Sequence, residues 1–301
     1  MQEDNSLITR RDFIRGAGCA AIGLAVGLPL LADENKEAPL NIKSRVVLVR
    51  HAEAVDEKGQ INGDIIQQML DDAMVALYKK EDPVTCWKQI ITHDDIVGIK
   101  TNVWRMLPTT TEVEQAIKKR ILDVGVPEKN IGIDDRGVLD NPVFQKATAL
   151  INARPMRTHS WSGVGSLIKN YIMFVRRPPD YHENSCANLG AIWQLPHVKD
   201  KTRLNILVLL TPLFYGVGPH HFDTTYVWKY RGLLVGTDPV AVDTVGLQIL
   251  QAKRRIYFGE DRPIKPAAHH VAIAGRKFNL GTSDPEMIDL IKVGWMDEVL
   301  I

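Results

Sequence analysis

The sequence predicts an α/β fold with a mostly parallel sheet that is covered by helices on both faces. Short apolar segments alternate with amphipathic segments from Arg45 onward, the order typical of parallel sheets. The run Leu204–Leu210 (LNILVLL) is apolar throughout, as in strands buried on both faces. Hydrophobic residues make up 45% and charged residues 24% of the chain, ordinary values for a folded globular domain.

The beginning of the chain is predicted to be a twin-arginine export signal. Arg10-Arg11 precedes a Gly/Ala-rich run, Gly16–Ala32, that is too weakly hydrophobic for a membrane span. An uncleaved anchor, or a chance arginine pair before a core helix, is the alternative. We expect a signal over residues 1–32, a linker over 33–44 and a single α/β domain over 45–301. The expected location is periplasmic or otherwise extracytoplasmic, with the twin-arginine translocation machinery as a partner.

Strands are predicted from short β-branched or continuously apolar runs that end in polar or turn residues. They are Arg45–Arg50, Ile96–Thr101, Ile131–Ile133, a short strand ending at Met156, Leu204–Leu210 and Leu233–Val235. The sixth of these is followed by Asp238-Pro239, a typical helix start.

Helices are predicted where apolar residues recur at a spacing of three and four. Thr111 and Glu114 form a capping-box pattern, and Gly125 provides a stop signal. The helices are Asp64–Lys79, Pro83–Ile91, one between Thr111 and Gly125, one from Pro142, Ser166–Val175, Asp238–Gln251, Pro266–Lys277 and Pro285–Val293. The pattern weakens between Asp180 and Lys201, which predicts an irregular insertion.

The strongest candidate site is the stretch Ile151–Tyr171. Residues 157–159 (Arg-Thr-His) are predicted to lie on a strand-to-helix loop, where α/β proteins bind ligands. Gly163 and Gly165 allow the backbone to come close to a ligand, and the next helix start offers N–H groups to an anion. Lys169-Asn170 lies about one turn inside that helix and within reach of the same mouth.

Polar side chains follow most of the predicted strands, and a parallel sheet would bring them to one edge. They are Arg50, His51, Lys100, Asn102, Asp134, Asp135, Arg157, His159 and Asp238. The alternatives are local: Asp238 as a helix N-cap, the two aspartates as turn caps and His159 bonded to loop backbone.

Three roles are expected among these residues and the pair Lys169-Asn170. Lys100, Asn102, Arg157 and Asn170 suit the binding of a carboxylate or phosphate substrate. His159, Lys169 and Asp134 are the candidate catalytic residues. We expect the imidazole of His159 to stay neutral near pH 7, because its neighbours are cationic. A nearby Asp134 or Asp135 would act in the opposite direction, so their distance decides the balance. Asp134, Asp135 and His159 are the candidate ligands of a divalent metal.

Several functions are disfavoured. A formal net charge of +1 argues against nucleic-acid binding. The three cysteines, Cys19, Cys86 and Cys186, form no CxxC, so no cysteine-ligated iron–sulfur cluster is expected. After signal cleavage the last two would either pair or remain separately buried. No P-loop, GxGxxG, HExxH or GxSxG motif is present.

The chain resembles the domain of unknown function 362. The matching segments are IVGIKTN (96–102), IGIDDRG (131–137), INARPMRTHSWSGVGSLIKN (151–170), GVGP (216–219) and TDPVAVDTVG (237–246). The resemblance spans about Arg45 to Gly294. It implies a redox-associated family without an established reaction. Some members carry ferredoxin-type cysteine quartets, which this chain lacks.

Two functions are therefore expected. The first is an exported enzyme that acts on a small anionic substrate at the carboxyl edge of the sheet, with metal assistance as an option. The second is a non-catalytic anion- or metal-binding protein, or an accessory to a redox partner protein.

Overall fold

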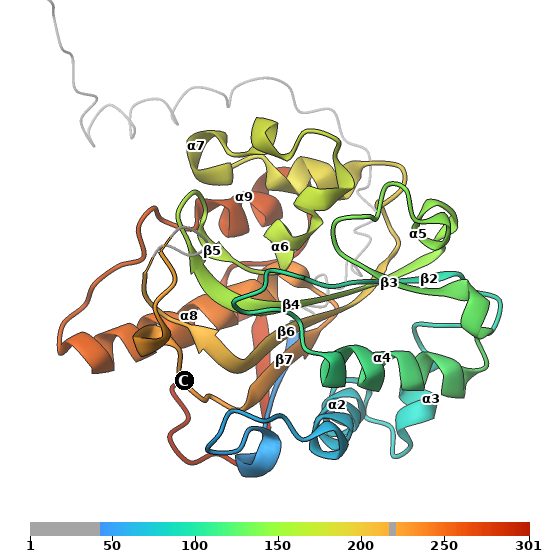
Figure 1. Cartoon of the computed structure of the whole chain (residues 1–301), viewed down its shortest axis with the longest axis horizontal. Coiled ribbons are helices and arrows are strands. Elements are labelled where there is room, and N and C mark those ends of the chain that lie inside the picture. The colour runs from blue at the N-terminus through green and yellow to red at the C-terminus, as the bar shows by residue number, and fades with distance from the viewer. Residues whose placement is uncertain (1–42, 217–220) are drawn as a thin grey trace, which may run out of the picture. The chain divides into compact units, whose positions relative to one another are not determined.

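The computed structural model describes residues 43–216 and 221–301, so the predicted export signal lies outside the described residues. Its centre is an eight-stranded sheet in the order β3-β2-β4-β6-β7-β1-β8, with β5 paired to β4 (Figure 1). The strands are β1 (Ser44–Arg50), β2 (Val97–Lys100), β3 (Ile131–Asp134), β4 (Ala149–His159), β5 (Gly163–Gly165), β6 (Thr202–Leu213), β7 (Gly232–Gly236) and β8 (Ile288–Gly294).

Strand directions confirm the mostly parallel sheet. β4 is parallel to β2 and β6, β2 is parallel to β3, and β1 is parallel to β8. β7 is antiparallel to both of its neighbours, β6 and β1, which therefore share one direction. The carboxyl ends of β2, β3 and β4 consequently lie next to one another at one edge.

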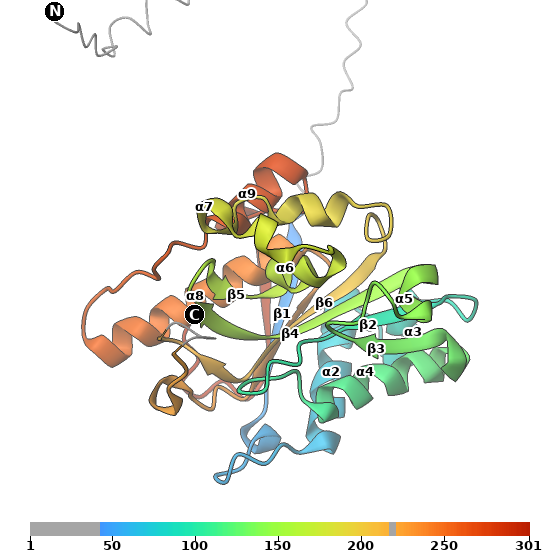
Figure 2. The ribbon, with the colours of Figure 1, turned by 45° about the horizontal axis from the view of Figure 1, so that its top comes forward.

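Helices cover both faces of the sheet (Figures 1 and 2). They are α2 (Gly63–Tyr78), α3 (Pro83–Trp87), α4 (Thr111–Val124), α5 (Pro142–Lys146), α6 (Leu167–Asn170), α7 (Glu183–Cys186), α8 (Pro239–Phe258) and α9 (His269–Phe278). Side chains of α2, α3 and α4 share one apolar cluster with the sheet. Side chains of α8 share another with β1, β6 and β7, and α6 and α9 share a third. In the described residues, no helix is long and apolar enough to cross a membrane.

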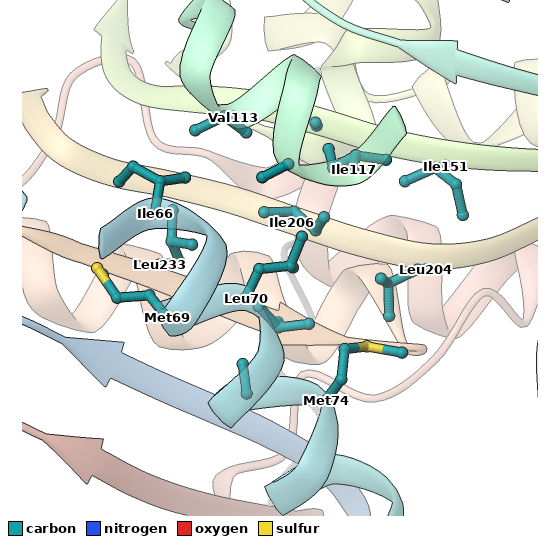
Figure 3. Close-up of a cluster of buried hydrophobic side chains, with 14 of the residues drawn as sticks. Ile66, Met69, Leu70, Met74, Val113, Ile117, Ile151, Leu204, Ile206 and Leu233 are labelled. Atoms are coloured by element: carbon teal, nitrogen blue, oxygen red, sulfur yellow. The ribbon is translucent and has the colours of Figure 1, made fainter. Parts of the chain in front are cut away.

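The helix predicted over Asp64–Lys79 is confirmed as α2. Ile66, Leu70 and Met74 recur every four residues on one buried face, which packs with α4 onto the sheet (Figure 3). Each buried side chain of this size stabilises the fold by about 1.5–3 kcal/mol. This layer holds β2, β4 and β6 in place beneath the candidate site.

The helix predicted over Pro285–Val293 is wrong. A single 3-10 turn at Pro285–Met287 leads into strand β8. Residues Asp289 and Lys292 are more exposed than the apolar residues between them, and the backbone pairs with β1 from Ser44↔Ile288 onward. As a strand, this segment forms its backbone hydrogen bonds with β1. A short surface helix would have to satisfy them within itself, and short isolated helices are only marginally stable.

The strand predicted to end at Met156 continues to His159, so residues 157–159 lie on β4 and not on a loop. The chain then turns back, and β5 pairs antiparallel with β4 through Arg157↔Gly165 and His159↔Gly163. Gly163 has a φ of +76°, which favours glycine, at the start of this return strand. The helix predicted after it is the four-residue α6, followed by a 3-10 turn at Tyr171–Phe174.

Smaller corrections concern helix ends. The N-cap of α4 is Thr110 and makes no side-chain capping bond, so the capping box predicted at Thr111 and Glu114 is not formed. α3 ends at Trp87, whereas α8 runs on to Phe258. The predicted irregular insertion contains short helical turns, including α7. Cys86 and Cys186 are buried and free.

Candidate functional site

A cavity of about 250 Å³ lies at the carboxyl ends of β2, β3 and β4. Of the residues expected at the site from sequence, its lining contains Asn102, Asp135, Arg157, His159, Lys169 and Asn170. Two further expected residues, Lys100 and Asp134, do not line it. The lining also contains residues that the sequence interpretation did not select, above all Arg154, Trp104 and Trp161.

Arg154 and Arg157 come from the same strand and line the same cavity. In a regular strand, side chains three positions apart point to opposite faces. Here the pairing of β4 with β6 is irregular between Pro155 and Arg157, and such irregularities re-aim side chains. Gly165 marks where the two side chains meet: a Cβ added there would lie 2.7 Å from Arg154 Nη2 and 3.4 Å from Arg157 Cγ.

Both guanidinium groups are buried and incompletely bonded. Arg154 is 3% and Arg157 4% exposed. Arg154 Nε and Arg157 Nε and Nη1 have no hydrogen-bond partner among the described residues. Burial lowers the pKa of Arg154 to about 10 and holds that of Arg157 well below its ordinary value. Arg157 packs 4.3 Å from the ring of Trp104, a contact that supports a cation without satisfying its N–H groups.

Lys100 is fully paired inside the protein. Its ammonium donates to the carbonyl of Thr101, to Asp135 Oδ1 and to Asn170 Oδ1. An ammonium has three N–H donors, so none remains for a ligand. Asp135 also accepts from Val103 N, and the Lys100 ammonium helps to hold the pKa of its carboxyl below the usual value despite burial. Lys100 therefore organises the loops behind the cavity.

The N-terminus of α6 is not available to an anion, contrary to the prediction. Asp243, on α8, accepts hydrogen bonds from Leu167 N and Ile168 N. Ser166 Oγ donates to the same carboxylate at 2.7 Å. The protein thus supplies its own anion to this helix start. The buried cationic groups that line the cavity are Arg154, Arg157 and Lys169, and the exposed Arg136 also lines it.

Lys169 is 3% exposed, and its Nζ lies 3.5 Å from the sulfur of Cys186. Burial and, to a smaller extent, the cationic Arg154 and Arg157 lower the pKa of its ammonium from 10.5 to about 8. Neighbouring Cys186 acts in the opposite direction. A lysine with a pKa near 8 holds its proton at neutral pH but can release it readily, as a proton-transfer group must.

His159 is 5% exposed, and its pKa is strongly lowered, first by burial and then by Lys169 and Arg157. The direction agrees with the neutral imidazole expected from sequence, although burial is the larger cause. Nδ1 accepts a hydrogen bond from Trp161 N at 3.2 Å. In a neutral imidazole the proton then lies on Nε2, so that His159 can donate to an anion in the cavity.

The other expected residues form hydrogen bonds with other groups of the protein. Asp134 Oδ1 accepts from Gly137 N, and Oδ2 accepts from Asn141 Nδ2, as in a turn cap. Asn102 Oδ1 accepts weakly from Trp104 N at 3.4 Å. Asn170, through Nδ2, bonds Asn152 Oδ1 and the carbonyl of Lys100.

Three strand-end residues lie away from this cavity, although the sequence grouped them with it. β7 is antiparallel, which places Asp238 at the opposite edge of the sheet. There it caps α8, as the local alternative proposed, by accepting from Val240 N and Ala241 N. Arg50 donates to the carbonyl of Tyr230, and His51 caps a 3-10 turn.

No metal-binding group is apparent in the described part of the chain. Within residues 43–216 and 221–301, no three or more His, Cys, Asp or Glu side chains gather as ligands. Asp134 and Asp135 have separate protein partners, and His159 uses Nδ1 internally.

Charge is unbalanced around the cavity. The buried cations are Lys100, Arg154, Arg157 and Lys169, and the buried carboxylates are Asp135 and Asp243. These two are the only carboxylates in the described residues that are buried. Burying unpaired charge is expensive, so this arrangement favours an anionic occupant.

A larger cavity of about 570 Å³ lies beside Arg254. Its guanidinium donates to the carbonyls of Arg262, Phe214 and Pro263. Arg254 therefore serves the fold, and among the described residues that line this cavity there is no comparable unpaired guanidinium.

Part of the chain matches a known family model, and that part contains residues of the cavity. Residues 126–248 match the family model Domain of unknown function (DUF362). The match supports the resemblance noted from sequence but is shorter than the span from Arg45 to Gly294 expected there. The DUF362 segment contains β3 to β7 and the cavity residues Arg154, Arg157, His159 and Lys169. No curated protein and no solved structure matches the chain.

Arg154 is the main residue that sequence interpretation missed. Arg154 lies in the apolar first half of the stretch Ile151–Tyr171 and directly precedes Pro155. A charged residue followed by a proline is unusual in an interior strand. That pair was the available signal of a strand irregularity.

Proposed function

We propose that the protein binds a small, multiply charged anion in this cavity and acts on it as an enzyme. The observation that carries the proposal is the pair Arg154 and Arg157, buried with three guanidinium nitrogens unpartnered among the described residues. Guanidinium groups match the oxygens of phosphates and carboxylates, so either class of anion would satisfy these donors.

We assign Lys169 as the group that exchanges a proton with the bound anion. His159 donates a hydrogen bond to the same anion from Nε2. A lysine pKa of about 8 supports the first role, because proton transfer is efficient when the pKa is near the working pH. The proposal assigns no metal, since the described residues bring no ligand set together. Lys100, Asn102 and Asn170 would shape the site and not touch the charge of the substrate directly.

A non-catalytic anion-binding or redox-accessory protein is the second candidate. Asp135 is already bonded to Lys100 and Val103 N, and His159 Nδ1 is bonded to Trp161 N. The Asp135 carboxylate and His159 Nδ1 are therefore already engaged with the protein, which favours binding without turnover.

Thermal unfolding of the full chain with phosphate, sulfate, malonate or citrate tests the binding. A true ligand at about one hundred times its Kd stabilises the fold by about 2.7 kcal/mol. Arg157→Gln should abolish this shift. Arg120→Gln, which removes an ion pair with Asp71 on α2, should retain it. An equal shift in the Arg157 variant would overturn the proposal.

Turnover separates the two candidates. Each anion that binds is incubated with the protein and followed by NMR for chemical change. For an enzyme, Lys169→Met should slow the conversion by about 10²-fold or more while binding weakens less. Binding without conversion of any ligand would favour the accessory protein.

We also propose export through the twin-arginine route, supported by Arg10-Arg11 and the following apolar run. An extracytoplasmic location is part of this proposal.

A further inference from the structure

Two indole rings line the cavity, whose buried interior is cationic. Trp161, on the turn between β4 and β5, is 44% exposed, and its ring lies 4.2 Å from that of His182. Trp104, on the loop after β2, lines the same cavity and contacts Arg157. Two indole rings thus border a site whose base carries guanidinium and ammonium groups.

Exposed apolar side chains gather on the same two loops. The described residues leave six large apolar side chains exposed, and Val103, Met106 and Trp161 are three of them. Val103 and Met106 flank Trp104 on its loop. Scattered exposed apolar residues need no explanation, but Trp161 lines the cavity itself, and a pocket lined partly by aromatic side chains suits an apolar group.

The buried cationic groups of the cavity are accessible only to something small. Arg154, Arg157 and Lys169 are at most 4% exposed, so the side chains of a flat protein surface would not reach them. A cavity of about 250 Å³ exceeds what one inorganic anion needs, since it corresponds to roughly eight water molecules. The remaining space is lined in part by Trp104, Trp161 and Met173.

We propose that the ligand is an organic anion that carries a flat aromatic or conjugated group. Its phosphate or carboxylate end binds Arg154 and Arg157, and its flat group packs at Trp161 and Trp104. This inference rests on the proposed anion site and adds the class of the substrate. Indole rings favour stacking with flat groups over contact with short alkyl chains.

The test compares matched anions by isothermal titration calorimetry on the full chain. Methyl phosphate and phenyl phosphate form one pair, and malonate and phenylmalonate form the carboxylate pair. In whichever pair binds, the phenyl member should bind at least about tenfold more tightly. Which pair binds distinguishes a phosphate from a carboxylate ligand.

Trp161→Ala should bring the two affinities of the pair to within about twofold of each other. The substitution keeps the backbone N–H that bonds His159. Tyr257→Ala, at an exposed aromatic side chain that does not line the cavity, is the matched control and should preserve the preference.

The outcomes distinguish a failure of the aromatic-ligand proposal from a failure of the anion-site proposal. Equal affinities for phenyl and methyl members in the wild type, abolished by Arg157→Gln, would overturn the aromatic substrate but leave the anion site. Affinities unaffected by Arg157→Gln would overturn both. A preference that survives Trp161→Ala would remove Trp161 from the proposal.

Discussion

Ser166 and Asp243 join two segments that are far apart in the chain, through a 2.7 Å hydrogen bond from Ser166 Oγ to the carboxylate. The same carboxylate accepts from the first two N–H groups of α6. Asp243 is fully buried, and its charge lies close enough to Arg154 to affect the pKa of that guanidinium. The helix that carries Lys169 is therefore anchored to α8 through one aspartate.

Asp243→Asn should destabilise the fold by about 2–4 kcal/mol, because it removes a buried charge that accepts three hydrogen bonds and balances Arg154. Ser166→Ala removes only one of those bonds and should cost about 1 kcal/mol. Urea unfolding measures both. Equal effects of the two substitutions would contradict the anchoring role of the carboxylate.

Arg157→Met should leave the free energy of unfolding of the ligand-free protein unchanged or raise it by up to about 2 kcal/mol, since it removes a buried charge with unsatisfied donors. Arg254→Met is the matched comparison. It leaves three carbonyls without their guanidinium donor and should cost about 2–4 kcal/mol. Chemical denaturation without added anions tests both. A large loss for Arg157→Met would mean that the side chain serves the fold.

Lys169 makes stability depend on pH above neutrality. The folded protein releases this proton near pH 8, whereas the unfolded chain keeps it to about 10.5. The unfolded state then binds more protons, so the contribution of Lys169 to stability rises between these values. Lys100, with a pKa also lowered to about 8, acts in the same window. Lys169→Met should therefore remove part of the rise.

The measurement is the free energy of unfolding at several pH values for the wild type and Lys169→Met. Lys119→Met, at a lysine whose side chain is 57% exposed, is the control. Anion affinity should change in the other direction, falling as the pH passes 8, because neutral Lys169 no longer attracts the ligand. Identical pH profiles for the wild type and Lys169→Met would exclude a lowered pKa.

Gly165→Ala should weaken anion binding by about tenfold, because the new Cβ would displace the guanidinium of Arg154. The displaced atoms are the far end of a flexible side chain, so stability should change by less than about 1 kcal/mol. Gly63→Ala, with its nearest neighbour at 3.7 Å, serves as the control. Calorimetry and urea unfolding provide the two readings, and unchanged affinity would contradict the placement of Arg154.

Replacing Arg10 and Arg11 by lysines should block export of the chain, because the twin-arginine machinery recognises the pair itself and not its charge alone. Cell fractionation followed by immunoblotting measures the periplasmic share. An unchanged periplasmic share of the protein would contradict the assignment of residues 1–32 as a twin-arginine signal. The same double substitution should not alter anion binding by the purified full chain.

Local pattern was enough for most elements of the fold. The period of α2, the β-branched run of β1 and the Asp-Pro start of α8 all depend on neighbours in sequence, and all three are confirmed. β8 was missed because its strand form depends on pairing with β1, at the other end of the domain. The Thr110 cap of α4 shows a limit of local signals, because an available capping box is not used.

The sequence by itself determined the α/β class, the mostly parallel sheet and the stretch that carries Arg157, His159 and Lys169. Only the tertiary structure decided which charges are paired. Lys100 is neutralised by Asp135, and the start of α6 is occupied by Asp243. Arg154 and Arg157 form no salt bridge within the described residues. Pairing depends on distances between residues remote in the chain and on the direction of each strand, and neither is encoded in local periodicity.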